Sequence, residues 1–424
     1  MKSFLGTLSL LAGLSWLLAA CGPASSSQLA RSAATRLTAP NAPAADLAAL
    51  VQGNNSFALD LYRSLEVQQG NLILSPFSIS LALAMTSAGA AGETQAQMER
   101  VMHFELPPDR LHPAFNQLDL DLARRAETAG GDEHPLQLSI ANGIWAQQGH
   151  PFLVDFLDRL AVHYGAGIRL ADFITQPEVV RREINGWVAD QTKDKIKDLL
   201  PEGVPDSQAR MVLVNAIYFK ADWERPFESR STSDQPFHLL DGTEVQAEMM
   251  SRGMGIPYRQ GDGYQSVELP YQGGTAAMDI LVPDAGTFAE FEAGLDASRM
   301  EQILGGMQPT SVSLGLPKFS YTSQFGLADQ LAGLGMTDAF DPQLADFSAM
   351  DGQRDLYIGA VIHKAFVAVD EQGTEAAAAT GVIMEATGAP VFEVNLTIDR
   401  PFIFLIRDLP SGQILFIGRV LDPT

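Results

Sequence analysis

The residues that most often carry out chemistry are few in this chain and widely spaced. Seven histidines lie at positions 103, 112, 134, 150, 163, 238 and 363, and Cys21 is the single cysteine. Their spacing fits no metal site, and the sequence has no Gly-x-Ser-x-Gly, His-Glu-x-x-His or Walker motif. The glycine pairs at 253–255 and 261–263 precede no helix pattern, which favours turns. We therefore expect no catalytic residues, no metal and no cofactor, and we predict that the protein is not an enzyme.

The chemistry that the sequence does favour is cleavage of the chain by another enzyme. A strand-like run at 362–370 is followed by Glu-Gln-Gly-Thr-Glu-Ala-Ala-Ala-Ala-Thr at 371–380, and strongly apolar residues return at 391–406. A segment of small residues has no large side chain to anchor it on a core. We expect a mobile loop that a protease can reach.

The alternation of residues in this loop is also compatible with a buried strand. Successive strand residues point to opposite faces, and one face would carry only small or apolar side chains. That face comprises Thr374, Ala376, Ala378, Thr380, Val382 and Met384, whereas Glu375 and Glu385 would point to the solvent. Four consecutive alanines are also typical of a helix or a flexible linker, because alanine is a poor strand former. The loop alone leaves these alternatives open.

Five segments, in the same order along the chain, resemble motifs of the serpin family. Leu-Thr-Ile-Asp-Arg-Pro-Phe-Ile-Phe-Leu-Ile at 396–406 is similar to the C-terminal signature, and 371–379 is similar to the hinge of inhibitory serpins. The others lie at 71–80 (Asn-Leu-Ile-Leu-Ser-Pro-Phe-Ser-Ile-Ser, continuing to 94), 214–224 and 316–319. The similarity spans 46–423. It implies an α+β serpin fold with a helix-rich N-terminal half packed on large mixed or antiparallel sheets.

The resemblance also implies an exposed reactive-centre loop over about 371–395 and a mechanism. A protease forms an acyl-enzyme with the loop, the hinge inserts into the large sheet, and the protease is trapped in a covalent complex. Family spacing places the scissile bond at Thr387–Gly388, with Ala386–Thr387 as the one-residue alternative and Met384 also open. The hinge comprises Glu371, Gly373, Thr374, Glu375, Ala376, Ala377, Ala378 and Ala379.

Four further residues match the serpin shutter, a hydrogen-bonded group under the large sheet. His363 and Asn215 match its histidine and asparagine, and Ser75 and Ser78 match the serines beside them. A histidine at the edge of an apolar strand usually has a structural role. The resemblance implies the same, because the shutter controls how the sheet opens.

The residues near the scissile bond bear on the target. Small uncharged residues suit elastase-like or subtilisin-like pockets, and no Lys or Arg occurs between Lys364 and Arg400. We expect serine endopeptidases, with cysteine endopeptidases as a further possibility. Two rival interpretations are a non-inhibitory serpin and a surface lipoprotein that only binds other proteins. The small-residue hinge favours the inhibitor, since non-inhibitory serpins depart from that pattern.

The N-terminus predicts export. Lys2 precedes an apolar stretch at 4–20 that is too short for a membrane span, and Leu18-Ala19-Ala20-Cys21 is similar to the lipobox of bacterial lipoproteins. We expect a signal peptide over 1–20, a lipidated Cys21 and a flexible Ala/Ser/Pro-rich tether over 21–45. The protein would then contact the membrane only through its lipid, in the cell envelope. Gly22 after the cysteine favours the outer membrane or cell surface.

Helices and strands must position these features within one domain. Helix patterns dominate the first half from 46 onward, and strand patterns dominate from 263 onward, which is an α+β arrangement. No linker or repeat divides 46–424. The net charge of −23 argues against a nucleic-acid partner, because phosphates would be repelled. We expect a monomer.

Overall fold

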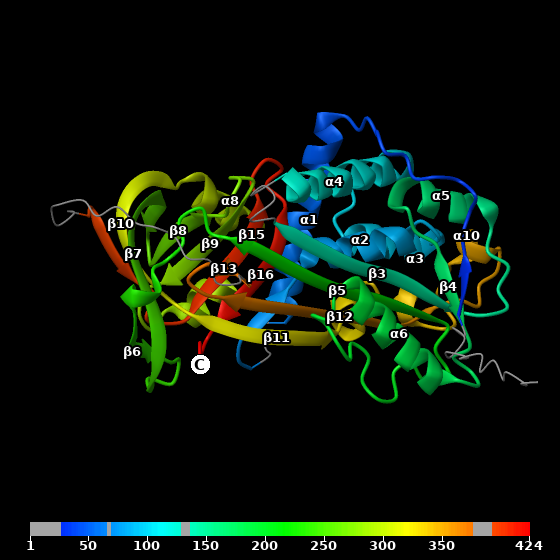
Figure 1. Cartoon of the computed structure of the whole chain (residues 1–424). Helices are drawn as coiled ribbons and strands as arrows, with labels where there is room; N and C mark the ends of the chain where they lie inside the picture. Colours follow the sequence, from blue (N-terminus) through cyan, green and yellow to red (C-terminus); the bar gives the residue numbers. More distant parts are fainter. Residues whose placement is uncertain (1–26, 66–68, 129–135, 376–391) are drawn as a thin grey trace, which may run out of the picture.

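The computed structural model describes residues 27–65, 69–128, 136–375 and 392–424 of the 424-residue chain (Figure 1). Within these residues the α-helices are α1 (Ala44–Ser64), α2 (Pro76–Ser87), α3 (Gly92–Val101), α4 (Pro108–Thr128), α5 (Val154–Tyr164), α6 (Pro177–Gln191), α7 (Phe288–Ala293), α8 (Ala297–Gly305), α9 (Ala328–Gly333) and α10 (Ser348–Asp351). Two short 3-10 helices are η1 (Ser229–Ser231) and η2 (Asp338–Phe340).

The strands of the described residues form two sheets. In chain order they are β1 (Gln28–Ala30), β2 (Leu72–Leu74), β3 (Gln137–Gln147), β4 (Ile168–Ala171), β5 (Met211–Asp222), β6 (Thr232–His238), β7 (Glu244–Gly261), β8 (Tyr264–Pro270), β9 (Ala276–Pro283), β10 (Gln308–Pro317), β11 (Phe319–Gly326), β12 (Ile358–Val369), β13 (Gly373–Thr374), β14 (Val394–Thr397), β15 (Phe402–Asp408) and β16 (Ile414–Val420). The predicted α+β class, with a helix-rich first half, is confirmed.

The seven-stranded sheet has the order β1-β4-β3-β5-β13-β12-β11. β5 lies at its centre, antiparallel to β3 and parallel to β12. Nearly all of β5 is buried, as expected for a strand with helices on both faces. The nine-stranded sheet runs β14-β10-β7-β8-β9-β15-β16-β2, with β6 beside β7. Figure 1 shows this second sheet at the end of the molecule away from α5 and α6.

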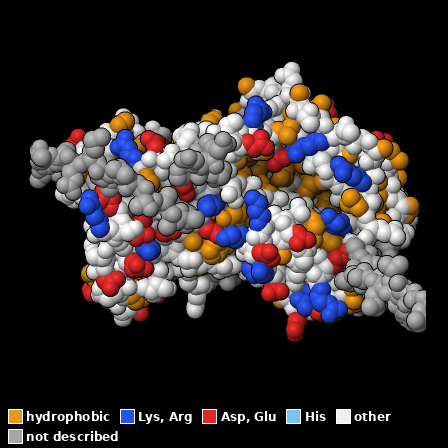
Figure 2. Space-filling view, in the orientation of Figure 1, with side chains coloured by type: hydrophobic (Ala, Val, Ile, Leu, Met, Phe, Trp, Pro, Cys, Tyr) orange, Lys and Arg blue, Asp and Glu red, His pale blue; other side chains and the backbone are white. Residues whose placement is uncertain are grey.

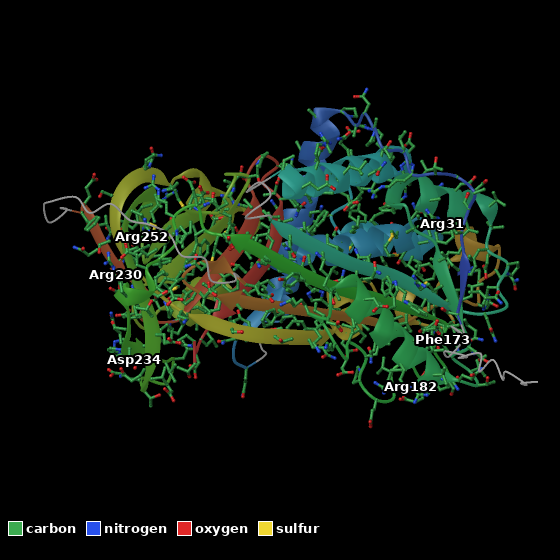
Figure 3. The ribbon with its side chains drawn as sticks, in the orientation of Figure 1. Arg31, Phe173, Arg182, Arg230, Asp234 and Arg252 are labelled. Carbon is green, nitrogen blue, oxygen red and sulfur yellow. The ribbon has the colours of Figure 1, made fainter. Side chains whose placement is uncertain are left out.

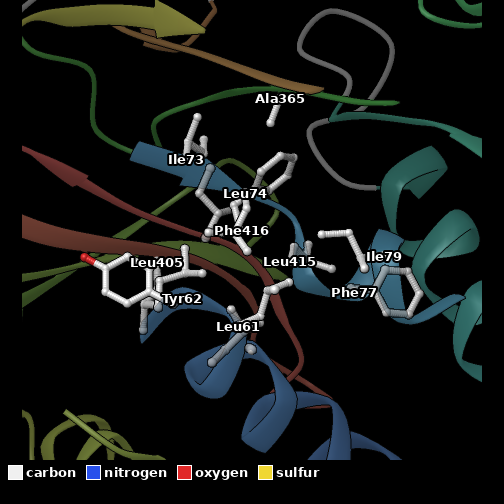
Figure 4. Packing of buried hydrophobic residues seen from close by; sticks show 14 of the residues in the cluster. Leu61, Tyr62, Ile73, Leu74, Phe77, Ile79, Ala365, Leu405, Leu415 and Phe416 are labelled. Atoms are coloured by element: carbon white, nitrogen blue, oxygen red, sulfur yellow. The ribbon is translucent and has the colours of Figure 1, made fainter. Parts of the chain in front are cut away.

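The two faces of β5 belong to different cores. Val212, Val214 and Ala216 pack with α6 residues such as Ile184, whereas the side chains between them face the main core. Figure 4 shows part of that main core, where α1, β2, α2, β15 and β16 contribute large apolar side chains. Those labelled include Leu61, Tyr62, Ile73, Leu74, Phe77, Ile79, Leu405, Leu415 and Phe416. A sheet covered on both faces can add a central strand without exposing that strand to water.

The start of α2 is fixed by its sequence. Ser75 is the N-cap, and its hydroxyl accepts a hydrogen bond from the Ser78 N–H. Pro76 occupies the first helical position, where its missing N–H has no helical partner to lose. All residues of α2 are buried, so the helix is enclosed by the fold and has no solvent-exposed face.

Residues 27–43, the described part of the tether that the sequence predicted over 21–45, are not free of the folded domain. Residues 27–43 lie along the folded domain, because β1 pairs antiparallel with β4 and extends the large sheet by one strand. Farther along, the Arg36 guanidinium donates to Asn116 at 2.9 Å, and the Leu37 N–H donates to the Val162 carbonyl at 2.9 Å. Figure 3 shows Arg31 at the end of the molecule opposite to Arg252 on β7. Composition predicted disorder here, whereas backbone pairing to β4 orders the segment.

The surface drawn in Figure 2 carries basic and acidic side chains interspersed over most of this face. No helix among the described residues has the length and apolar character needed to cross a membrane.

Candidate functional site

The central feature of the large sheet is a fork between β5 and β12. Over most of their length these strands pair directly, for example at His363 opposite Asn215. At one end β13 lies between them, so that Thr374 pairs with both Ala221 on β5 and Val369 on β12. The predicted hinge therefore begins as a short additional strand inside the sheet.

A tight turn leads the chain from β12 back into this fork. The Asp370 carboxylate accepts the N–H groups of Gln372 at 2.8 Å and Gly373 at 3.2 Å. Trp223 holds the turn from outside, because its backbone N–H donates to the Gln372 carbonyl and its indole N–H to the Asp370 carbonyl. A Cβ on Gly373 would overlap the backbone carbonyl oxygen of Ala221. Glycine is therefore required where the hinge enters the sheet.

Thr374 is fixed inside the protein. Its side chain is 1% exposed, and its hydroxyl lies 2.7 Å from the Tyr271 hydroxyl. The Tyr271 ring stacks on Trp223 with 4.6 Å between the centroids. Burial raises the pKa of Tyr271, so its hydroxyl keeps its proton at physiological pH. One of the two buried hydroxyls donates to the other, so each has a hydrogen-bond partner.

Glu375 ends the inserted strand. Its φ of 50° lies in the left-handed region, which non-glycine residues seldom adopt and which is incompatible with a continuing strand. Its N–H still donates to the Ala368 carbonyl at 2.7 Å, and its carboxylate forms an ion pair with Lys195. The Lys195 ammonium also lies over the Tyr218 ring, 5.6 Å from the centroid. The described part of the inserted segment ends at this residue.

Glu371 holds the hinge on its other side. Its carboxylate accepts the Thr232 hydroxyl at 2.8 Å and lies 3.5 Å from the Lys318 ammonium. Its carbonyl accepts the Phe227 N–H at 2.7 Å. The start of the hinge is therefore fixed to β6 and to the connections around it before the chain reaches Gly373.

The far end of the loop is held at the edge of the nine-stranded sheet. The Glu393 N–H donates to the Ser311 carbonyl at 3.0 Å, and β14 then runs parallel to β10. The Phe392 ring occupies the place where a side chain on Gly253 would lie. The prediction of a turn at 253–255 is wrong, since these residues belong to β7. The glycine serves instead to admit an aromatic ring.

Several predicted site residues lie outside the described residues. They are the remaining hinge residues Ala376, Ala377, Ala378 and Ala379, the scissile-bond candidates Ala386, Thr387 and Gly388, and the lipidation candidate Cys21.

The four residues matched to the shutter lie together under the sheet. The Ser75 N–H donates to His363 Nε2 at 3.1 Å, and His363 Nδ1 contacts the Asn215 side-chain oxygen. The Asn215 amide donates to the Ser78 hydroxyl at 2.5 Å. One network therefore joins β12, β5 and the start of α2.

The geometry fixes the protonation state of His363. A backbone N–H can only donate, so Nε2 must carry a lone pair, and the proton resides on Nδ1 facing the Asn215 oxygen. Burial lowers the pKa of His363 to about 3, which keeps the ring neutral. The network is thus built from neutral groups and adds no charge to the interior.

Asn142 on β3 is a member of this network that the sequence did not reveal. Its side-chain oxygen accepts from Asn215 and from the Ser78 hydroxyl, and its amide donates to the Ser78 carbonyl at 3.1 Å. An asparagine in a strand pattern carries no distinguishing signal. Only the pairing of β3 with β5, which sets Asn142 opposite Asn215, identifies it.

Comparison with known proteins agrees with this architecture. The sequence model of the family Serpin (serine protease inhibitor) matches residues 52–423. The leukocyte elastase inhibitor of Equus caballus is 39% identical over 388 residues, covering 88% of this chain and 99% of the relative. An uncharacterized serpin-like protein of Thermococcus kodakarensis is 38% identical over 377 residues, covering 88% and 86%.

Solved structures show the same fold. The native state of the thermophilic serpin tengpin superposes with a TM-score of 0.81 at 30% identity, covering 93% of this chain and all of that one. A tumour suppressing serpin superposes with a TM-score of 0.78 at 25% identity, covering 88% and 99%. The chain belongs to the serpin family of serine protease inhibitors.

Proposed function

We propose that this protein is an irreversible suicide-substrate inhibitor of serine endopeptidases that traps its target by inserting the cleaved loop. The observation that carries the proposal is β13, because the first residues of the loop already pair with β5 and β12. The rest of the loop can continue along the same two strands. Only the direct β5–β12 hydrogen bonds must be exchanged for bonds to the new strand.

The chemical step belongs to the protease. Its serine oxygen attacks the carbonyl carbon of Thr387, an ester forms, and the Gly388 amine leaves with a proton supplied by the catalytic histidine of the protease. Water would normally hydrolyse the ester. Insertion competes with that step by carrying the ester-linked enzyme along the sheet, and residues 374–387 would add a strand of about 45 Å at about 3.3 Å per residue.

Elastase-like and subtilisin-like enzymes are the proposed targets. The candidate scissile bonds have small uncharged residues before them, which fit shallow primary pockets. The similarity to a leukocyte elastase inhibitor supports this class. Cysteine endopeptidases that form a thioester by the same attack are further candidates.

We also propose that the protein is held in the cell envelope by acyl chains on Cys21, at the outer membrane or the cell surface. The lipobox-like Leu18-Ala19-Ala20-Cys21 supports this location. Several acyl chains bind a bilayer stably where one does not. The folded part is proposed to act as a monomer that meets its protease beside the membrane.

A gel experiment tests the inhibitor proposal. The protein is mixed with neutrophil elastase, pancreatic elastase or subtilisin, and the products are separated in SDS. We expect a band close to the summed mass of both proteins, which the same protease with a chemically blocked serine does not give. If every protease gives only cleaved chain and no complex, the protein is a substrate or a non-inhibitory member, and the proposal is wrong.

A further inference from the structure

We propose that His150, Asp351 and Asp355 form a binding site for a first-row divalent cation, with Zn²⁺ as the best fit. His150 Nδ1 lies 3.0 Å from an Asp351 carboxylate oxygen and 3.7 Å from an Asp355 carboxylate oxygen. The three ligand atoms lie within 4.8 Å of one another. Figure 1 shows α10, which ends at Asp351, at the end of the molecule away from β13, so the site is separate from the hinge.

The distances suit a single metal ion. Zinc binds imidazole nitrogen and carboxylate oxygen at about 2.0–2.2 Å, which places neighbouring tetrahedral ligands about 3.4 Å apart. The distance from His150 Nδ1 to the Asp351 oxygen, 3.0 Å, is slightly shorter than this, and the distance to the Asp355 oxygen, 3.7 Å, is slightly longer. The Asp355 side chain is 55% exposed, so it can rotate and shorten its distance to His150. Three protein ligands would leave the fourth position for water.

The local chain presents both carboxylates to the histidine. Asp351 ends α10, and Gly352 follows with a φ of 83°, a left-handed conformation that turns the chain sharply. The Gln353 N–H donates to one Asp351 oxygen at 2.8 Å and leaves the other facing His150. The intervening Arg354 is directed to Asp346, at 3.3 Å.

The charge of the cluster also calls for a cation. The Asp351 side chain has no exposed surface, and a buried carboxylate is stable only with a compensating positive charge or several hydrogen bonds. A metal ion bound by His150 Nδ1 and the Asp351 carboxylate would supply that charge. The donor set selects among metals, because an imidazole ligand favours zinc over calcium and magnesium, which prefer oxygen ligands.

The site is held in shape without the metal. The Leu153 N–H donates to the Met350 carbonyl at 2.7 Å, which joins the turn after β3 to the end of α10. His150 belongs to the first of these segments and Asp351 to the second. A bound ion would therefore add to an existing contact and would not have to assemble the two segments.

A zinc titration tests the site. We would titrate Zn²⁺ into the full chain carrying Cys21→Ser, which removes the thiol as a competing ligand, at pH 7.5 by calorimetry. One equivalent should bind, and His150→Gln or Asp355→Asn should weaken that binding by at least about tenfold. The matched control is His238→Gln, which alters an exposed histidine paired with the single carboxylate of Glu244 at 3.2 Å and should leave binding unchanged.

Thermal unfolding supplies a second readout that does not depend on calorimetry. Zinc should raise the melting temperature of the Cys21→Ser chain and of the His238→Gln chain, but not that of the Asp355→Asn chain, since binding to the folded state stabilises it. The proposal is overturned if no zinc binds, if the two ligand variants bind as well as the parent, or if Ca²⁺ or Mg²⁺ binds as tightly. Loss of protease trapping would not bear on it.

Discussion

The hydroxyl groups of Tyr271 and Thr374 lie 2.7 Å apart in the interior, where they connect the two sheets. Tyr271 directly follows β8 of the nine-stranded sheet, whereas Thr374 belongs to β13 of the seven-stranded sheet. The hinge is thus attached to the strands beside it and also to the body of the protein across the core.

This contact predicts a measurable coupling. Tyr271→Phe or Thr374→Val would leave one buried hydroxyl without its partner, and each should lower the free energy of unfolding by about 1–3 kcal/mol. The double variant should lose about 1 kcal/mol less than the sum of the single losses. Urea unfolding of all four proteins measures the coupling. Simple additivity would show that the hinge does not bond to Tyr271 in solution.

A large charged side chain at the first inserted position should abolish trapping. Thr374→Arg places a guanidinium at a site that is 1% exposed, so the hinge can no longer pair between β5 and β12. The protease should then cleave the loop and dissociate, giving cleaved product and no SDS-stable complex. The control is Gln308→Arg, which adds the same charge at an exposed position of β10. Full trapping by Thr374→Arg would contradict the insertion mechanism.

The neutral His363 predicts how stability depends on pH. Its pKa is about 3 in the folded protein and about 6.5 in an unfolded chain, so between these values the unfolded state binds the extra proton. Stability should therefore fall as the pH drops below 6.5, by up to about 1.4 kcal/mol per pH unit from this group. His363→Gln should reduce that slope in urea titrations from pH 6.5 to 4.5. Equal slopes in the parent protein and in His363→Gln would refute the assignment.

Cleavage of the loop should make the protein more resistant to heat. After a cut between residues 376 and 391, the freed segment can extend β13 and fill the fork. We expect a clear rise in melting temperature after limited proteolysis, and no rise with a blocked protease. An unchanged melting temperature would mean that the uncut protein stores no energy for trapping.

The N-terminal proposal has its own test. Cys21→Ser should move the protein from the membrane fraction to the soluble fraction of a bacterial expression host, because the acylated atom is lost. Cys21→Ala should behave in the same way, whereas Ser27→Ala, which keeps the cysteine, should remain in the membrane fraction. If the Cys21 variants stay in the membrane fraction, a lipid on Cys21 is not what anchors the protein.

The sequence predicted the α+β class and the helix-rich first half well, because these follow from local periodicity. It also predicted that Thr374 can point inward, since alternation along a strand fixes the face. It could not predict partners distant in the chain. Asn142 is recognised only through the register of β3 on β5, and the described N-terminal segment gained order from a strand pairing that composition does not encode.

The candidate metal cluster shows the same limit. Local spacing indicated no metal site, and His150 lies about two hundred positions from Asp351, with which it forms a close pair. This pair forms because the segment after β3, which contains His150, lies against the end of α10, which contains Asp351. Likewise, the sequence around Gly253 predicted a turn. In the structure this glycine lies in β7, where it leaves room for the Phe392 ring.

The fork between β5 and β12 has a kinetic consequence. The slow event in building an ordered chain segment is usually its nucleus, since several residues lose their freedom before the first bond is gained. Here that nucleus, β13, is already part of the structure, and Glu375, the last described residue before the rest of the loop, has a left-handed φ of 50°. In a molecule that traps its protease, insertion would then extend an existing strand, and the slow step of forming its first hydrogen bonds would not be needed during the competition with hydrolysis of the ester.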